Sequence, residues 1–272
     1  MLAIKNNLMA VNAARHLGVS YDALSRSVER LSSGLRINSA KDDAAGLAVR
    51  ELMRSDLAIT EQGIRNAQDG ISMLQTMEGA MAVVDDALVR MQQLAEQAAT
   101  GSYSIAQRGI MQNEFAEMRL EIDRVAGATT FNGIKMLDNS ASVAIHFGKL
   151  ETDNIGIAGS NITSASGGLN ITGLTIADVA SAKNALIELD SAISIKDSAR
   201  ASFGYKMNRL EGTISVLGIA AENLQASESR VSDVDVATEM ASLTKNQVLA
   251  QAGISMLAQA NTMPQMALAL LR

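Results

Sequence analysis

The stretch LSSGLRINSAKDDAAGLAV, residues 31–49, separates two segments with helical periodicity. It has the Ser, Gly and Asn residues of a loop, and it contains no proline. Its charged residues, gathered into eight positions, are Arg36, Lys41, Asp42 and Asp43. Ser39 followed by Asp42 predicts a capping box that starts the next helix. The two aspartates would then lie at the positive end of that helix dipole.

Hydrophobic spacing predicts long helices on both sides of this stretch. Apolar residues three and four apart are typical of a helix that packs against another helix. Before the stretch, the apolar seam is Leu17, Tyr21, Leu24, Val28 and Leu31. After it, the spacing predicts helices over about 42–99 and 105–127, another from about 177, and a last one from near 235. A second polar link, SESRVSDVD at 227–235, precedes the last helix.

The period changes between about residues 139 and 175. The segments SVAIHFG, NIGIAG and GLNITGLTI are short, rich in β-branched residues and bounded by Gly, Ser and Asn, which predicts strands. Asn132-Gly133 predicts a hairpin turn just before them. The expected fold is therefore mainly α: a long antiparallel helical bundle or coiled coil, with paired terminal helices and a small central β-hairpin region.

Composition excludes several classes of protein. The 272 residues are 47% hydrophobic but only 3% aromatic, and the single proline, Pro264, leaves long helices unbroken. With no cysteine, disulfides and thiolate metal sites are excluded. A net charge of −6 without a basic patch argues against nucleic acid as a partner. No apolar run of about 18 residues occurs, so no membrane insertion is expected. Asn, Lys and Arg interrupt the N-terminal stretch MLAIKNNLMAVNAARH, so a cleaved signal peptide is not expected either.

The sequence contains no recognisable catalytic motif. It lacks H-E-x-x-H, G-x-x-x-x-G-K-[ST], G-x-G-x-x-G and G-x-S-x-G. The two histidines, His16 and His146, are far apart in the sequence. The adjacent pairs Asp42-Asp43 and Asp85-Asp86 would diverge on a helix, which makes them poor two-carboxylate sites. We therefore expect no enzyme activity, no cofactor and no metal site.

Both chain ends have apolar residues on more than one face, as in QAGISMLAQA and MALALLR. Each fully buried Leu or Ile contributes roughly 1.5–3 kcal/mol, whereas ordering the backbone costs about 1–2 kcal/mol per residue. Two thin helices leave much of this apolar surface in water. We expect them to be marginal alone and to fold fully when copies of the chain cover them. A self-contained bundle with ordinary amphipathic ends is the alternative.

Three motifs in order resemble the bacterial flagellins. LSSGLRINSAKDDAAGLAV resembles the N-terminal signature of that family, TTFNGIKML its hairpin entry, and VDVATEMASLTKNQVLAQAGISMLAQAN, with the terminal ALALLR, its C-terminal signature. The resemblance covers about residues 1–138 and 177–272. The middle segment is much shorter than the outer domains that many flagellins carry. The resemblance thus implies the filament core domains and little else.

The resemblance implies a filament subunit with two concentric layers joined by spokes. Residues 1–33 and 235–272 would pair as an inner coiled coil, residues 34–41 and 227–234 would be spoke linkers, and residues 42–226 would form an outer helical rod that includes the β-rich segment 130–176. Residues expected to contact neighbouring copies are Leu17, Leu24, Leu31, Arg36, Lys41, Asp42, Asp43, Met240, Leu243, Ile254 and Leu257. The family also implies export without a cleaved signal peptide to the flagellum outside the cell. Its further partners are an export chaperone on about residues 235–272, and the hook–filament junction and cap proteins.

Two further surfaces follow from the resemblance. LVRMQQLAEQAATG matches the stretch of some flagellins that a Toll-like receptor recognises, with Arg90 and Leu94 in place and Glu114 as a further contact. Gln92-Gln93 replaces a charged pair there, so weaker recognition is expected. Related flagellins carry O-linked sugars in the exposed middle region, and the candidate positions are Ser160, Thr163, Ser164 and Ser166.

Other functions remain as alternatives. A hook–filament junction protein shares the helical ends but forms a short adaptor rather than a long polymer. A helical adhesin or secreted effector would not form a filament. The missing motifs disfavour an enzyme.

Overall fold

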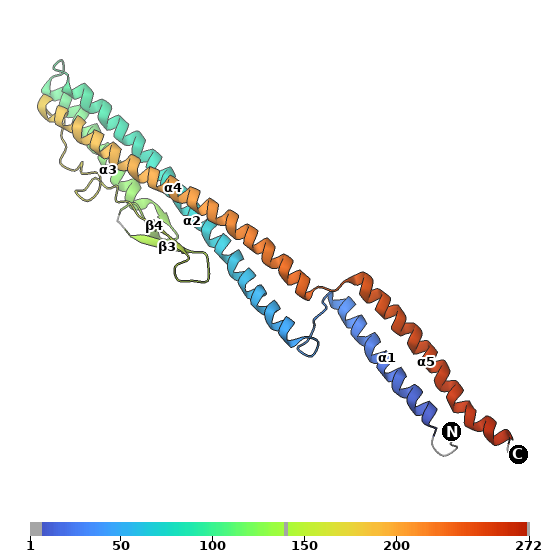
Figure 1. The fold of residues 1–272 in the computed structure, drawn as a ribbon. Coiled ribbons are helices and arrows are strands. Elements are labelled where there is room, and N and C mark those ends of the chain that lie inside the picture. Colours follow the sequence, from blue (N-terminus) through green and yellow to red (C-terminus); the bar gives the residue numbers. More distant parts are fainter. Residues whose placement is uncertain (1–6, 139–140, 271–272) are drawn as a thin grey trace. The chain divides into compact units, whose positions relative to one another are not determined.

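The computed structural model describes residues 7–138 and 141–270 and is mainly α-helical, as predicted (Figure 1). Residues 1–6, 139, 140, 271 and 272, which belong to the predicted domains, lie outside the described residues. The elements are α1 (Leu8–Ser33), α2 (Ala44–Ala99), α3 (Ile105–Ala128), β1 (Thr130–Phe131), β2 (Ile134–Lys135), β3 (Ser142–His146), β4 (Asn154–Ala158), α4 (Val179–Ser232) and α5 (Val236–Leu270).

The chain divides into two compact units. The first comprises Met1–Asp56 and Asn223–Arg272, and the second comprises Leu57–Glu222. The sequence placed the domain boundaries in the two links, whereas the units divide inside α2 and α4. The links therefore belong to the same unit as the terminal helices.

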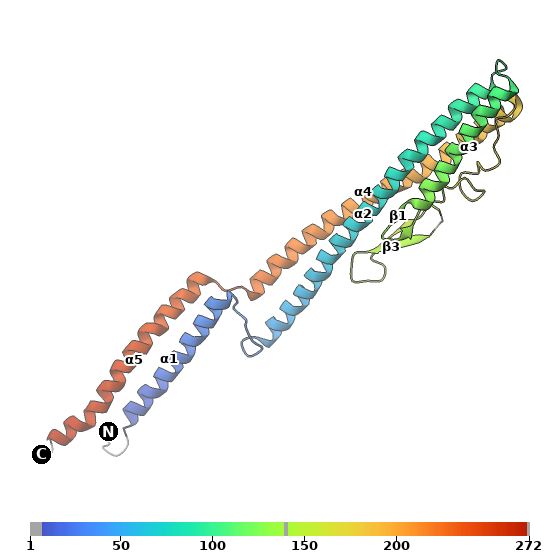
Figure 2. The same ribbon diagram turned by 180° about the vertical axis from the view of Figure 1, so that it is seen from behind.

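In the first unit, α1 and α5 lie side by side and antiparallel (Figures 1 and 2). Small residues let the two backbones approach closely: a Cβ added at Gly253 would lie 3.1 Å from Cδ1 of Leu17. The Asn7 side-chain amide donates to the Ala260 carbonyl (2.7 Å), and near the opposite end Arg30 pairs with Glu239 (3.7 Å). These contacts fix the register of the pair from end to end.

The second unit has a continuous apolar core. Along α2 the buried residues recur at helical spacing, among them Met77, Met81, Leu88 and Met91. They pack in one cluster with residues of α3, α4 and the β segment, such as Phe115, Leu189, Phe203 and Ile157. Alanine is the commonest residue of this core, followed by leucine, methionine and isoleucine, and the small alanine and unbranched methionine side chains fit closely packed helices.

A ladder of polar pairs sets the register of α2 against α4. Gln92 donates to Asp190 (2.7 Å), and Arg200 binds Glu78 (2.5 Å). Between them, Lys196 pairs with Asp85, although the Lys196 side chain is only 3% exposed. Burial lowers the pKa of Lys196, but its hydrogen bonds to Asp197 and Asp85 outweigh this effect and raise it. A shift of one helical turn would separate this buried ammonium group from Asp85 and leave it only Asp197 of its own helix as a partner.

Two small hairpins lie in the second unit. The β1–β2 hairpin has the predicted Asn132-Gly133 turn, with φ of 50° and 78° at its two central residues. Two positive φ angles are the mark of a type I′ turn. β3 and β4 pair antiparallel from Ser142 opposite Ala158 to His146 opposite Asn154.

The strand predicted at GLNITGLTI is wrong. Residues 168–176 form turns whose amides bond to nearby loop carbonyls, as Ile171 does to Ser164 (2.9 Å). Leu169, Ile171 and Ile176 are all buried in the core cluster. These loop side chains fill the core and alternate with polar residues in the sequence. The same alternation is typical of a strand, and this is why the sequence predicted one.

The helices start on polar caps. Asn7 caps α1, Ser104 and Gln107 form a capping box for α3, and Asp178 and Asp235 accept amide hydrogen bonds at the starts of α4 and α5. The start predicted for α2 near residue 42 is within two residues of Ala44, but the capping box predicted at Ser39 and Asp42 is wrong. The cap of α2 is Asp43, whose carboxylate accepts from the Gly46 amide (2.8 Å).

The second polar link is shorter than predicted, because α4 continues to Ser232. The stretch from Ser227 has no glycine or proline to stop a helix. Ser227 donates its hydroxyl to the Asn223 carbonyl (2.8 Å), so its side chain is satisfied within the helix. Only Asp233, Val234 and Asp235 separate the two helices.

Candidate assembly surface

The two links pair with each other. Gly34 ends α1 in a left-handed conformation (φ 74°), where residues other than glycine are rare. The chain then forms an antiparallel bridge between Leu35 and Asp233. The Arg36 amide donates to the Ser232 carbonyl (2.7 Å), and the Val234 amide donates to the Gly34 carbonyl (3.0 Å). Sequence reasoning identified both links but not their pairing, which depends on residues almost 200 positions apart.

Two arginines hold the first link in place. Arg36 Nη2 donates to the Val231 carbonyl (2.6 Å) near the end of α4. Arg50 Nη1 donates to the Ile37 carbonyl (3.0 Å). Ile37 itself is 1% exposed and lies against Gly46. Arg36, predicted to contact neighbouring copies, therefore has its guanidinium engaged inside its own chain.

The aspartates of the link are also satisfied internally. Asp42 Oδ2 accepts from the Ser39 amide (3.0 Å), the Ser39 hydroxyl (3.0 Å) and the Asn38 amide (3.2 Å). These bonds, the Ser39 hydroxyl first, hold the pKa of Asp42 below its ordinary value. Asp43 caps α2 as described. Of the four charged residues predicted to meet neighbours, only Lys41 has a side chain that makes neither a hydrogen bond nor an ion pair among the described residues.

The apolar seam predicted for α1 agrees with the structure at its leucines but not at Tyr21 and Val28. Leu17, Leu24 and Leu31 are partly buried beside α5, as are Leu243 and Leu257 on the opposite helix. Tyr21 and Val28, however, are 47% and 52% exposed. The inner positions between the leucines are instead held by small residues such as Ser20 and Ser27. Serine fits there because the helices approach too closely for larger side chains.

Apolar side chains cover the outer faces of the helix pair. Met240 and Ile254, predicted assembly residues, are 45% and 49% exposed. Further exposed apolar residues of α1 and α5 are Leu8, Met9, Val11, Val19, Tyr21, Val28, Val236, Val248, Leu249, Met256 and Met266. Exposed apolar surface of this extent marks an interaction site in soluble proteins.

The predicted receptor surface lies in the second unit. Arg90 and Glu114 form an ion pair (2.6 Å) between α2 and α3, with both side chains partly exposed. Leu94 is 2% exposed and belongs to the core. As a surface contact, the prediction for Leu94 is wrong, because a partner at this face would meet Arg90 and Glu114 but not Leu94.

The candidate glycosylation positions differ in accessibility. Ser166 is exposed, and Ser160 and Thr163 are partly buried. The Ser164 hydroxyl is buried and donates to Asp123 (2.7 Å). Ser164 is therefore not an acceptor in the folded chain, and that prediction is wrong.

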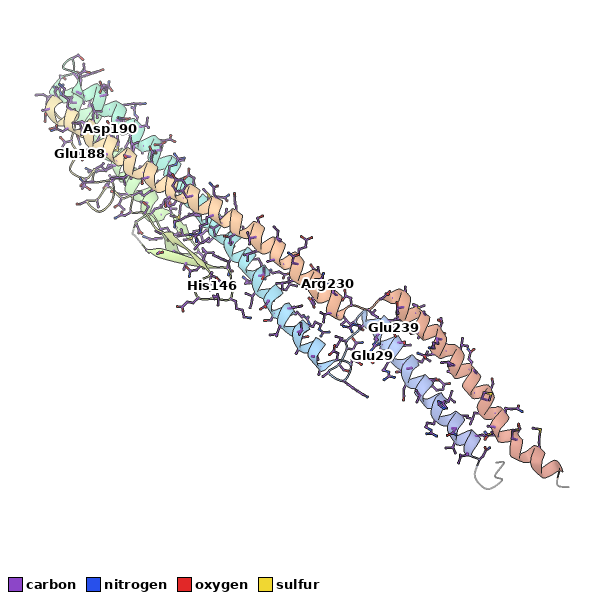
Figure 3. The ribbon with its side chains drawn as sticks, viewed as in Figure 1. Glu29, His146, Glu188, Asp190, Arg230 and Glu239 are labelled. Carbon is purple, nitrogen blue, oxygen red and sulfur yellow. The ribbon has the colours of Figure 1, made fainter. Side chains whose placement is uncertain are left out.

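The described residues hold no group of three or more His, Asp or Glu side chains that could bind a metal ion. His146, labelled in Figure 3, places its Nε2 3.0 Å from the Leu150 carbonyl within its own hairpin. Within the same described ranges, no helix combines the length and the hydropathy needed to cross a membrane.

Comparisons with known proteins agree with this geometry. Residues 4–142 match the family model for the bacterial flagellin N-terminal helical region, and residues 186–271 match that for the C-terminal helical region. A flagellar filament 33 kDa core protein of Treponema phagedenis is 41% identical over 286 residues, covering 100% of both chains. A flagellin of Halalkalibacterium halodurans is 41% identical over 277 residues, again covering 100% of both.

Among solved structures, a Bacillus cereus flagellin is similar with a TM-score of 0.51 and 31% identity. The match covers 56% of this chain and 88% of that one. Two family regions in the expected order, full-length relatives and the mainly helical fold lead to one assignment: the chain belongs to the bacterial flagellins.

Proposed function

We propose that this flagellin builds the flagellar filament through its first unit, with neighbouring copies covering the outer faces of α1 and α5. A flagellin is a structural filament subunit rather than an enzyme, and the filament is part of the flagellum outside the cell. The observation that carries the proposal is the exposed apolar surface of the helix pair. Val11, Val19 and Val248 are 63%, 59% and 63% exposed.

Burial of this surface supplies the driving force. Removing apolar area from water contributes roughly 25 cal/mol per Å². One copy cannot provide this burial, because α1 and α5 already use their inner faces against each other. A contact that joins two different faces of identical copies repeats without closing, which produces a helical filament.

The layered arrangement stays a proposal based on the family resemblance. Residues 1–33 and 235–272 would form the inner layer, the links would act as spokes, and residues 42–226 would form the outer rod. The paired links support a spoke of defined geometry, because Arg36, Ile37 and Arg50 bind it to the ends of the adjoining helices.

Further partners are also proposals. An export chaperone would cover residues 235–272 before assembly, and the cap and hook–filament junction proteins would contact the ends of the polymer. A Toll-like receptor would contact the second unit at Arg90 and Glu114. Sugars would attach at the accessible hydroxyl groups, of which Ser166 is exposed. We also propose that the chain is exported without a cleaved signal peptide.

Elongation from filament seeds tests the proposed function. Purified chain added to seeds should extend them continuously, whereas a hook–filament junction protein would add a bounded ring and stop. The double variant Val248→Ser and Ile254→Ser should raise the critical concentration for elongation about tenfold or more, because it removes apolar contact between copies. Leu150→Ser, at a residue 64% exposed in the β3–β4 loop, is the matched control and should change little. Equal elongation by both variants would contradict the proposal.

A further inference from the structure

A polar pocket lies within the first unit, where α1, the first link and α5 meet. Its volume is about 380 Å³, and α1 contributes Arg26, Ser27 and Arg30 to its lining. The link contributes Lys41 and Asp42, and α5 contributes Glu239, Ser242 and Asn246. Figure 3 labels Glu239 at the start of α5 and Glu29 on the facing part of α1.

Positive charge exceeds negative charge in this pocket. Glu239 is paired with Arg30, and Oδ2 of Asp42 already accepts three hydrogen bonds from Ser39 and Asn38. Arg26 and Lys41 make no ion pair within residues 7–138 and 141–270. Three cations and two carboxylates thus line the pocket, and Arg26 and Lys41 have no ion-pair partner among the described residues.

The floor of the pocket offers unused hydrogen-bond donors. Ser27 is 3% exposed, and its hydroxyl makes no hydrogen bond to any residue that the structure describes. The side chains of Ser242 and Asn246 are likewise unpaired within those residues. These side chains line the pocket with free donors beside two unpaired cations, so the site favours a ligand that accepts hydrogen bonds. A carboxylate meets both requirements, since it carries negative charge and only accepts.

We propose that this pocket receives an Asp or Glu carboxylate from a second copy of the chain. Such groups are abundant on a copy, because the chain has 29 acidic against 23 basic residues. The pocket also adjoins the apolar assembly surface: exposed Val28 follows Ser27 on α1, and exposed Met240 follows Glu239 on α5. This inference rests on the proposed function and names a polar contact that orients the copies.

Zero-length cross-linking tests the contact directly. A carbodiimide activates a carboxylate, the Lys41 amine attacks it, and an amide forms while the reagent leaves as a urea. Filaments grown from equal amounts of ¹⁴N and ¹⁵N chain should yield mixed-isotope peptide pairs that join Lys41 to an Asp or Glu. Lys183, an exposed lysine on α4, is the control and should not be joined to the carboxylate that Lys41 joins. Pairs of Lys41 with a single isotope composition only, in filaments that elongate normally, would overturn the proposal.

Charge variants test its energetic role. Lys41→Gln and Arg26→Gln should each raise the critical concentration about tenfold, the effect expected for a lost charge-assisted hydrogen bond. Lys41→Arg keeps the positive charge, so it should elongate better than Lys41→Gln, but it should not form the cross-link. The control Lys183→Gln should elongate like wild type. If 10 mM sulfate at constant ionic strength lowered the critical concentration of wild type but not of Lys41→Gln, and Lys41 gave no cross-link, the pocket would hold a free anion and the inference would fail. Failure of wild type to elongate seeds at all would instead refute the proposed function.

Discussion

The Asp42 carboxylate stabilises the conformation of the first link. It accepts hydrogen bonds from the Ser39 hydroxyl, the Ser39 amide and the Asn38 amide. Its pKa lies below the ordinary value of 3.8, chiefly because of the Ser39 hydroxyl. With a depressed folded pKa, the stabilisation is present above the unfolded pKa and is lost as the pH falls through the folded pKa. We expect the Asp42 carboxylate to titrate below pH 3.8 in ¹³C NMR, and Ser39→Ala to move the midpoint towards 3.8.

The matched control for this prediction is Ser25→Ala, since Ser25 is an exposed serine of α1. It should leave the Asp42 midpoint unchanged. A midpoint in Ser39→Ala equal to that of wild type would mean that the hydroxyl does not stabilise the ionised carboxylate.

Residue roles in the link were only partly predictable. Charge and loop composition identified residues 31–49 as unusual, and the contact of Lys41 with a neighbouring copy stays a prediction. Arg36 binds the Val231 carbonyl instead, and Ile37 is buried against Gly46. The Arg36 contact joins residues 195 positions apart, so a local sequence pattern contains no information on it.

At the scale of elements, close approach of α1 and α5 depends on Gly253. A Cβ there would lie 3.1 Å from Leu17 Cδ1, so a branched side chain must push the helices apart. We expect Gly253→Val to lower the free energy that protects the Leu24 amide from hydrogen exchange by about 1–3 kcal/mol. Gly218→Val, on α4 with no atom within 4 Å of the added Cβ, should leave the Leu24 value unchanged. Equal Leu24 protection in the two variants would show that the helices tolerate the added volume.

The helices themselves were predictable, and their faces were less so. Hydrophobic periodicity predicted both ends of α2 and α3 and the start of α5 to within two residues. It succeeded because a long amphipathic pattern with a helical period fits few structures other than a helix. It assigned Tyr21 and Val28 to the seam because it ranks residues by hydrophobicity, whereas the close helix pair selects small residues such as Ser27. It also ended α4 early, because serines that bond within a helix look like a loop in sequence.

On the scale of the whole molecule, the two units differ in how much they bury. The second unit has a core that runs from Ala67 to Leu210, whereas the paired terminal helices bury only Ser27, Ala250 and Ala260 within the described residues. The free energy that protects an amide follows the burial around it. In the isolated chain, the Leu24 and Ile254 amides should therefore exchange much faster than those of Leu88 and Leu189.

In the filament, neighbouring copies should cover the first unit and slow exchange at Leu24 and Ile254 by at least about 100-fold, which corresponds to roughly 2.7 kcal/mol. Leu88 and Leu189 are buried in the isolated chain already, so their exchange should change far less on assembly. Hydrogen–deuterium exchange followed by mass spectrometry, on monomer and on filaments grown from seeds, measures both pairs in one sample. Full protection of Leu24 and Ile254 in a monomer that shows no tendency to associate would contradict the account, because the apolar faces of α1 and α5 would then need no second copy.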